Sequence, residues 1–335
     1  MTAALAPFRS ILVPLDGSPL AEQALPLAAD LARRTGGKLK LVLVHRLPPP
    51  PIDPVGTKVF TSIELATRKA ERAYLRGVQT RLREGGVPLT APVTLRGSAG
   101  PALARYVQEL GIDLVIMATH GRGGIRRAWL GSVADYLIRH LRIPVLAVRP
   151  AEDESVAGGP SRASQILVPL DGSDLAEAAL EPAAALARAW GHELTLMQVV
   201  SPVQLAIDAA VPFPSAYDQE LTEMWRKQAQ DYLADVAERL RGEGLRATGV
   251  AIVGWNTVTS LLEVARPDKV ALVVLATHGH GGLRRIALGS VADKLVRGAE
   301  VPVLVCRPAR PGKPRQRSLA QSRSRGHRAA QEVGR

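Results

Sequence analysis

Two glycine-rich segments contain the residue types that proteins use to hold phosphate groups. The first runs from Gly121 through Gly131 to Ser132, and residues 279–290 repeat its spacing. A phosphate is held by several backbone N–H groups that no side chain obstructs, and glycine permits that close approach. A helix that begins at the serine adds unpaired N–H donors and the positive end of its dipole. The spacing predicts anion-binding loops, although glycines that only form turns remain an alternative.

Other phosphate-binding and catalytic motifs fit these segments poorly. A Walker loop ends in Gly-Lys-Ser/Thr, which neither segment contains, and a dinucleotide-binding fingerprint would follow the first strand of its domain. His120 and His278 lie in the loops, but no Ser/His/Asp set is recognisable around them. No cluster of cysteine and histidine indicates a metal site. We therefore expect binding chemistry, with no committed catalytic residue and no protein-held metal.

A carboxylate follows the first predicted strand of each glycine-bearing unit. Asp16 comes directly after one such strand and Asp171 after the other. A carboxylate at this place can accept hydrogen bonds from a ribose hydroxyl or an adenine amine. It can equally cap the helix that follows, as aspartate often does in turns. The spacing favours neither interpretation over the other.

These segments belong to an internal repeat as long as a domain. Residues 11–18 recur letter for letter as 166–173, and residues 118–150 recur at most positions as 276–308. A repeat of this length indicates a duplicated domain rather than a solenoid. We expect one domain at 1–150, a linker rich in Gly, Pro and acidic residues at 151–164, and a second domain at 165–310. Residues 311–335 are expected to form a basic disordered tail.

Strands and helices alternate along each copy. The first copy is predicted to contain strand Ile11–Val13, helix Leu20–Arg34, strand Leu39–Val44, helix Ala66–Glu84, strand Val93–Arg96, helix Ala102–Leu110, strand Asp113–Ala118, helix Ser132–Leu141 and strand Val145–Val148. The proline-rich segment 48–54 should be neither helix nor central strand. The second copy repeats this order, and Trp225 and Tyr232 of its long helix fall at core spacing. Such alternation predicts a parallel sheet covered on both faces, with ligands at its carboxyl edge.

Composition and charge limit the class of protein. The chain has 335 residues with a net charge of +12, and about half of that excess lies in the tail. A basic tail can bind nucleic acid without sequence preference, or it can simply be solvated. No apolar stretch approaches the length of a membrane span. The single cysteine, Cys306, excludes an internal disulfide and favours a reducing compartment, so we expect a cytoplasmic protein.

The motifs together resemble the universal stress protein family in its tandem, two-domain form. The family's nucleotide motif runs Gly, two residues, Gly, nine residues, Gly and then Ser or Thr. Both copies match it except at the first glycine, which is Ala118 in one and Ala276 in the other. The Pro-x-Asp after the first strand and the closing Pro-Val-Leu strand also match in both copies. The resemblance covers both domains and leaves out the linker and the tail.

This resemblance implies two tandem Rossmann-like, HUP-type α/β/α domains, each with a five-stranded parallel sheet in three layers. It also implies nucleotide contacts at Pro14, Leu15, Asp16, Met117, Ala118, Gly121, Gly131, Ser132 and Val133, and at Pro169, Leu170, Asp171, Val199, Leu275, Ala276, Gly279, Gly289, Ser290 and Val291. Where family members carry an apolar residue at the end of strand two, the second copy has Val199 and the first has Arg46. We therefore expect unequal sites, with the second the better suited to a nucleotide.

The function implied is that of a cytoplasmic stress-response sensor or regulator that binds ATP, with any Mg²⁺ carried by the nucleotide's phosphates. The two copies are expected to pack as a pseudo-dimer through their final strands, which leaves a homodimer of whole chains open. Two alternatives remain. One is a nucleotide-free interaction or chaperone-like stress protein, and the other is a weak ATP hydrolase or adenylyl-transfer enzyme of the same fold group. Contact with nucleic acid is expected only through the tail, and contact with membranes is not expected.

Overall fold

The computed structural model describes residues 8–46, 53–119, 130–149, 163–203, 216–277 and 288–307 of the chain. In its first half the strands are β1 (Ser10–Leu15), β2 (Lys38–His45), β3 (Val93–Arg96), β4 (Leu114–Ala118) and β5 (Val145–Val148). The helices of this half are α1 (Pro19–Glu22), α2 (Leu25–Thr35), α3 (Pro54–Glu84), α4 (Ala99–Glu109) and α5 (Ser132–His140). Strand and helix alternate along the described chain, as the sequence predicts.

The second half repeats this order element by element. Its strands are β6 (Gln165–Pro169), β7 (Glu193–Val200), β8 (Ala247–Val253), β9 (Leu272–Ala276) and β10 (Val303–Cys306). Its helices are α6 (Asp174–Glu177), α7 (Leu180–Trp190), α8 (Ala216–Gly242), α9 (Thr257–Val264) and α10 (Ser290–Gly298). In the stretches that the structure describes, no helix combines the length and apolar content that crossing a bilayer requires.

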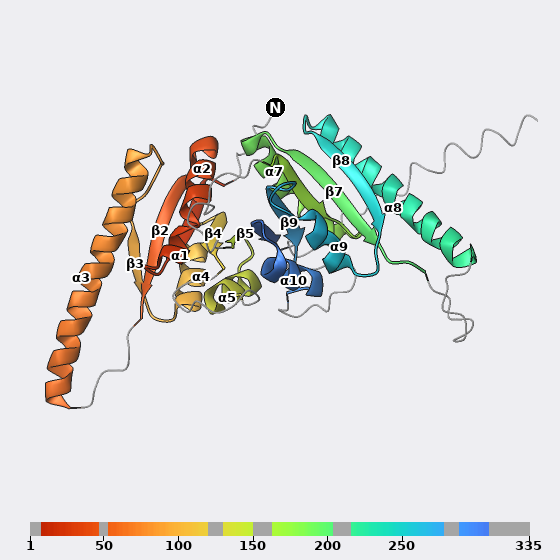
Figure 1. Ribbon diagram of the computed structural model, residues 1–335. Coiled ribbons are helices and arrows are strands. Elements are labelled where there is room, and N and C mark those ends of the chain that lie inside the picture. Colours follow the sequence, from red (N-terminus) through yellow and green to blue (C-terminus); the bar gives the residue numbers. More distant parts are fainter. Residues whose placement is uncertain are drawn as a thin grey trace, which may run out of the picture.

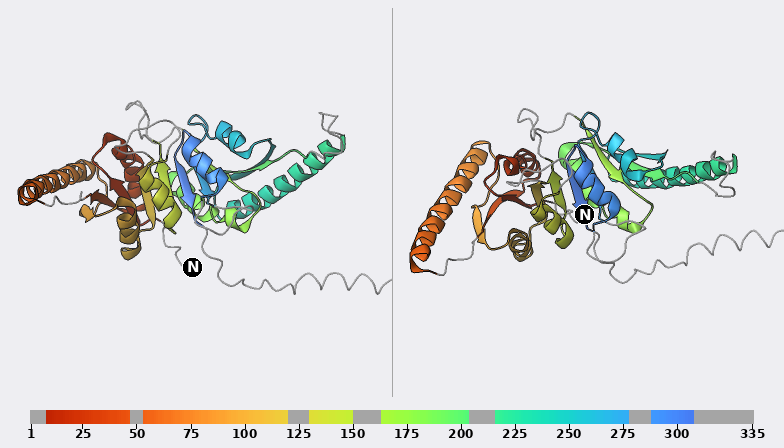
Figure 2. Two further views of the ribbon diagram at one scale, coloured as in Figure 1. Left: turned by 90° about the horizontal axis from the view of Figure 1, so that it is seen from below. Right: turned by 60° about the horizontal axis from the view of Figure 1, so that its bottom comes forward.

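The ten strands form a single sheet in the order β3-β2-β1-β4-β5-β10-β9-β6-β7-β8 (Figure 1). All neighbouring strands within each half are parallel, which confirms the two five-stranded parallel sheets expected. The halves meet where β5 and β10 pair antiparallel, with Leu304 opposite Leu146. The final strands therefore join the two copies, as predicted, and α3 and α8 lie at opposite ends of the molecule (Figure 2).

Helices cover both faces of this sheet and make three layers. One face carries α2, α3, α7 and α8, and the other carries α4, α5, α9 and α10. Alternate strand residues point to opposite faces, so that Ile11 and Val13 pack on the first face and Leu12 on the second. Because both faces are covered, the central strands are apolar throughout, and every residue of β4 is buried. The core of the first face runs without a break from one half into the other.

A single helix predicted over Leu20–Arg34 is instead two helices, α1 and α2. The prediction missed the effect of Pro26, which lies in the first turn of α2. Proline has no N–H to donate to the carbonyl four residues earlier, and its ring clashes with that carbonyl, so the helix breaks before it. The second half breaks in the same way between α6 and α7, just before Pro182.

The long helix α3 also differs from its prediction, because it begins at Pro54 rather than at Ala66. Proline is tolerated in the first turn of a helix, where its missing N–H has no partner to lose. Pro54, the last residue of the proline-rich segment 48–54 that was expected to exclude helix, is thus the first residue of α3. Residues 47–52 lie outside the described part of the chain. The helix consequently has 31 residues.

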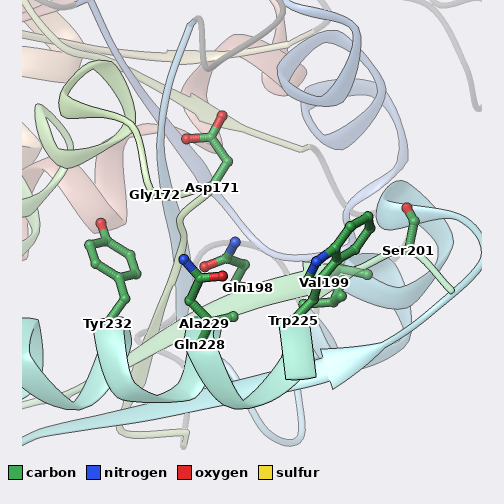
Figure 3. A pocket seen from close by; sticks show the side chains of 10 residues that line it. Asp171, Gly172, Gln198, Val199, Ser201, Trp225, Gln228, Ala229 and Tyr232 are labelled. Carbon is green, nitrogen blue, oxygen red and sulfur yellow. The ribbon is translucent and has the colours of Figure 1, made fainter. Parts of the chain in front are cut away.

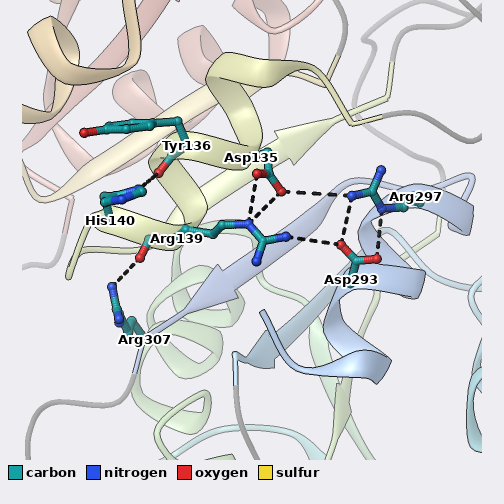
Figure 4. Close-up of polar contacts among 7 residues, drawn as sticks. All are labelled: Asp135, Tyr136, Arg139, His140, Asp293, Arg297 and Arg307. Carbon is teal, nitrogen blue, oxygen red and sulfur yellow. Dashed lines mark hydrogen bonds and ion pairs between the residues drawn. The ribbon is translucent and has the colours of Figure 1, made fainter. Parts of the chain in front are cut away.

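Reciprocal arginine contacts complete the joint between the halves. Arg149, just after β5, donates from Nη1 to the carbonyls of Gly298 and Ala299 at the end of α10, at 3.3 Å each. Its counterpart Arg307, just after β10, donates from Nη1 to the carbonyl of Arg139 at 2.5 Å (Figure 4). Unpaired carbonyls at a helix end attract cations, so each half caps the last helix of the other.

Charged side chains on α5 and α10 face one another across this joint. Arg139 pairs with Asp135 on its own helix at 2.9 Å, and Arg297 pairs with Asp293 in the same way. Each arginine also lies 4.0 Å from the other helix's aspartate, which makes a ring of alternating charge (Figure 4). These side chains are about one-third exposed, so the ring contributes to the orientation of the halves more than to their stability.

Candidate functional site

The carboxyl edge of the sheet carries most of the residues singled out from the sequence. In each half the chain runs from the first strand to the two strands on one side, and then returns to the other side. The strand order therefore reverses between β1 and β4, and again between β6 and β9. Ligands of open α/β sheets bind at such reversal points, beyond the carboxyl ends of the strands.

The aspartate after the first strand orders the turn into the following helix. Asp16 Oδ1 accepts hydrogen bonds from the Ser18 backbone N–H at 2.9 Å and from the Ser18 hydroxyl at 2.6 Å. The Ser18 hydroxyl oxygen in turn accepts a hydrogen bond from the Ala21 N–H at 3.2 Å and so caps α1. Gly17 between them has φ 83°, a conformation that favours glycine. The carboxylate thus orders the turn, but the side chain that caps the helix is that of Ser18 and not, as one interpretation of the sequence expected, that of the aspartate.

The second half repeats this turn contact by contact. Asp171 Oδ1 accepts from the Ser173 N–H at 3.1 Å and from its hydroxyl at 2.6 Å. Ser173 accepts from the Ala176 N–H at 3.1 Å, and Gly172 has φ 80°. Asp171 is more exposed than Asp16. In both halves the carboxylate is held by the turn in a fixed place at the sheet edge.

The glycine-rich segments begin and end at one point of this edge. Thr119, directly after β4, donates its N–H to the Val148 carbonyl at 2.8 Å and accepts from the Gly131 N–H at 2.7 Å. Thr277 and Gly289 make the equivalent bond at 2.8 Å in the second half. Residues 120–129 and 278–287, including Gly121 and Gly279, lie outside the described residues. The structure therefore shows the closed base of each loop.

The helices that follow the loops begin at the same edge, and the first N–H groups of each have no carbonyl partner within the helix. The first helical hydrogen bond of α5 runs from the Asp135 N–H to the Gly131 carbonyl at 2.9 Å. The N–H groups of Ser132 and Val133 precede that bond, so the helix itself offers them no carbonyl. α10 repeats this arrangement with a bond from the Asp293 N–H to Gly289. Such first turns are anion sites in many proteins.

Several of the expected contact residues have side chains that a ligand does not reach. Leu15, Met117, Leu170 and Leu275 are at most 6% exposed and belong to the core on one face or the other. Their side chains fill the sheet layer beneath the edge, as do those of β-strand residues generally. At these four positions the sheet edge presents backbone groups rather than side chains.

The pairing of Val199 with Arg46, used to predict unequal sites, is wrong. In the first half Pro14 pairs with Val42, and in the second half its repeat Pro169 pairs with Met197. Counting two residues onward, Val199 corresponds to Val44, so both halves have valine there. The counterpart of Arg46 is Ser201. The second strand therefore gives no reason at this position to prefer either site.

A pocket of about 530 Å³ lies beside Asp171, between β7 and α8 (Figure 3). Gln198 and Val199 line it from β7, and Trp225 and Tyr232 line it from α8. Core positions were predicted for both aromatic residues, but Trp225 is 47% exposed. Helical periodicity places Trp225 on the same face of α8 as Ala229 and Tyr232, but it does not tell how fully the sheet covers each turn of that face. Trp225 thus forms a wall of the pocket rather than part of the core, whereas Tyr232 lines the pocket and also packs, partly buried, against the core as expected.

Tyr232 is held rigidly in that wall. Its hydroxyl donates to Glu177 Oε1 at 3.0 Å, and Arg239 donates to the other carboxylate oxygen at 2.7 Å. Burial and the neighbouring Glu177 raise the pKa of the Tyr232 phenol well above its ordinary value. The hydroxyl is therefore a neutral donor at physiological pH. Burial likewise raises the pKa of the Cys306 thiol, which disfavours the reactive thiolate form.

The comparisons with known proteins agree with this geometry. The family model described as "Universal stress protein family" matches residues 7–149 and again residues 163–307. The chain belongs to the universal stress protein family. Universal stress protein Rv2005c of Mycobacterium tuberculosis is 32% identical over 199 residues, which are 58% of this chain and 62% of that protein. The chain thus matches rather less than two-thirds of the length of that relative.

Other relatives match over nearly the whole chain. Universal stress protein Rv1996 of Mycobacterium tuberculosis is 28% identical over 318 residues, covering 89% of this chain and 94% of that protein. The crystal structure of a universal stress protein from Archaeoglobus fulgidus superposes with a TM-score of 0.64 at 19% identity. It covers 90% of this chain and 99% of that one. At this identity the superposition establishes the fold alone.

The two halves of this universal stress protein differ where the pocket lies. The place of Val200 and Ala229 is taken in the first half by His45 and Glu71, whose side chains pair at 2.9 Å. His45 is 3% exposed, and its Nε2 has no hydrogen-bond partner within the described residues. Sequence reasoning missed this pair and the pocket amides. A polar residue at the inward position of an otherwise apolar strand, as in both β2 and β7, is the signal that could have found them.

Proposed function

We propose that this universal stress protein binds an adenine nucleotide, and ATP in particular, at the carboxyl edge of its sheet. In this proposal it acts as a cytoplasmic regulator of a stress response. One observation carries the proposal: an ordered aspartate and the first turn of a helix stand at the same strand-order reversal, in both halves. The two copies have diverged elsewhere, but both retain these two features. The helix start suits the phosphate end of a nucleotide, and the aspartate suits the ribose or base at its other end.

The residues present fit the phosphate end of such a ligand. The first-turn N–H groups of Ser132 and Ser290, with the glycines before them, provide donors and a positive dipole end without a side chain in the way. The described residues contain no group of three or more His, Cys, Asp or Glu that could hold a metal ion. Mg²⁺ would accordingly enter with the phosphates of ATP and supply charge neutralisation there.

The residues at the first strand fit the other end of the nucleotide. Asp16 and Asp171 are held by Ser18 and Ser173 in a fixed orientation at the edge. A preoriented carboxylate accepts hydrogen bonds from a ribose hydroxyl or a base amine at little entropic cost. The proposal needs no catalytic residue, because a regulator that senses a nucleotide requires only binding.

Titration calorimetry with ATP and Mg²⁺ tests this function on the full chain. We expect heat of binding for the wild type and its loss in the variant that combines Gly131→Trp with Gly289→Trp, since an indole at each helix start obstructs the phosphate. Gly77→Trp is the matched control, because that glycine is exposed on α3 with open space around it. No heat and no ATP-dependent rise in melting temperature for the wild type would overturn the proposal.

A further inference from the structure

The pocket between β7 and α8 is built for a flat, uncharged group rather than for a phosphate. The described residues that line it include no lysine, arginine or histidine, and Asp171 is the one charged residue among them. An anion would therefore be repelled from it. Its volume of about 530 Å³ falls within the range of small-molecule sites. A phosphate bound at the start of α10 does not account for the uncharged residues that line this pocket.

Two rings and two primary amides dominate the lining. Figure 3 shows Trp225 and Tyr232 of α8 on either side, with the amides of Gln198 and Gln228 between them. Gln198 Oε1 is buried and accepts no hydrogen bond from any described residue. A buried acceptor without a donor costs free energy that a ligand donor can recover. An amide pairs well with the edge of a purine, and an exposed indole offers a stacking surface for its face.

The pocket is also rigid where a base would rest. Tyr232 is fixed by Glu177, which Arg239 holds from its other oxygen. Ala229, which is small and buried, leaves the space between the two rings open. A wall held before binding reduces the entropy that a ligand must otherwise overcome.

The first half lacks all three of the groups that would recognise a base. By the strand register, the residue of the first half that is equivalent to Gln198 is Leu43. The matching ion pairs of Arg81 and Arg239 align the long helices, which places Thr67 and Ala70 at the positions of Trp225 and Gln228. The buried pair of His45 and Glu71 fills the remaining place. The phosphate-binding ends of the two halves stayed alike while this region diverged.

We infer that the pocket between β7 and α8 binds the purine base of the nucleotide, and that Trp225, Gln198 and Gln228 select that base in the second half only. The inference rests on the proposed nucleotide function, because Asp171 belongs to both the sheet edge and the pocket. It assigns specificity to one half of the chain. The first half has neither an indole nor an amide at the equivalent positions. It therefore contacts the phosphates and ribose of a ligand without recognising its base.

Calorimetry with adenosine, inosine and ribose 5-phosphate tests this assignment. Three variants copy the first half and so use residues that the same fold already accommodates: Trp225→Thr, Gln198→Leu and Gln228→Ala. We expect Trp225→Thr to weaken adenosine binding about tenfold, as loss of base stacking does. The variant combining Gln198→Leu and Gln228→Ala should reduce the preference for adenosine over inosine, again by about tenfold. Met224→Ala, on the exposed side of the same helix, is the matched control.

Fluorescence supplies a second measurement that does not depend on affinity. Adenosine stacked on Trp225 should quench part of the tryptophan emission of the wild type, and this quenching should vanish in Trp225→Phe although that variant still binds. Ribose 5-phosphate, which lacks a base, should quench neither protein. If ATP binds the wild type and every pocket variant equally, the base pocket is wrong and the nucleotide function stands. If the wild type binds neither ATP nor adenosine, both are wrong.

Discussion

Truncating the leucines at the joint tests whether the two halves unfold as one unit. Leu146 of β5 and Leu304 of β10 lie opposite each other and are both fully buried. They belong to a core that continues across both halves. Each leucine-to-alanine change should lower the free energy of unfolding by about 3 kcal/mol, the usual cost of a buried truncation. Because the residues are neighbours, the double variant should depart from the sum of the single effects.

Guanidinium unfolding, monitored by both circular dichroism and tryptophan fluorescence, measures the free energy of unfolding and shows whether the halves unfold together. For the wild type and both single variants we expect one transition, coincident in the two signals, with its midpoint lowered in the variants. Leu110→Ala, at a residue 49% exposed beyond α4, should change the free energy by less than about 0.5 kcal/mol and serves as the control. Two separate transitions, with each truncation shifting only one of them, would refute the idea of a single cooperative core.

Three further predictions concern single sites. Burial, followed by the charges of Arg34 and Arg246, lowers the pKa of His192 from its ordinary 6.5. The unfolded chain then binds a proton more readily below that pH. Stability should therefore fall as the pH drops from about 7.5 to about 5.5, and His192→Gln should lose less stability than the wild type over that range in denaturation experiments. The buried thiol of Cys306 should resist thiol reagents in the native protein and react fully in denaturant; rapid native labelling would contradict its burial. Removing the cap hydroxyl with Ser173→Ala should cost about 1 kcal/mol in chemical unfolding, and an unchanged midpoint would show that the cap contributes nothing.

The elements of the sheet were predictable because their apolar periodicity and the repeat agree. The predicted strands Val93–Arg96 and Val145–Val148 have the bounds observed. The break before Pro26 was missed because the apolar spacing continues through it, although the missing N–H of proline was already visible in the sequence. The early start of α3 was missed because proline was treated as excluding helix even in a first turn.

The candidate site was predictable at the sheet edge and not in the pocket. Asp171 and Gly289 lie between a strand and the following helix, and in a parallel sheet all such connections begin at one edge, so their place at that edge follows from the alternation. Trp225 lies on the same face of α8 as Tyr232, but periodicity does not tell how fully the sheet covers each turn of that face. The incorrect match of Arg46 with Val199 has a related cause: a two-residue shift along a strand keeps the same face, and only the strand register reveals it.

The arginine caps at the joint make each half depend on the other, and this affects how two halves joined in one chain can evolve. Arg149 completes α10 and Arg307 completes α5, so an isolated half would have an open strand edge and an uncapped helix. Such a half would tend to associate with another copy of itself. In one chain the partner is always present at high effective concentration, so each half meets its complement and not its own kind. That constraint frees the two copies to evolve apart, because a change that suits one position never has to suit both sides of a symmetric dimer.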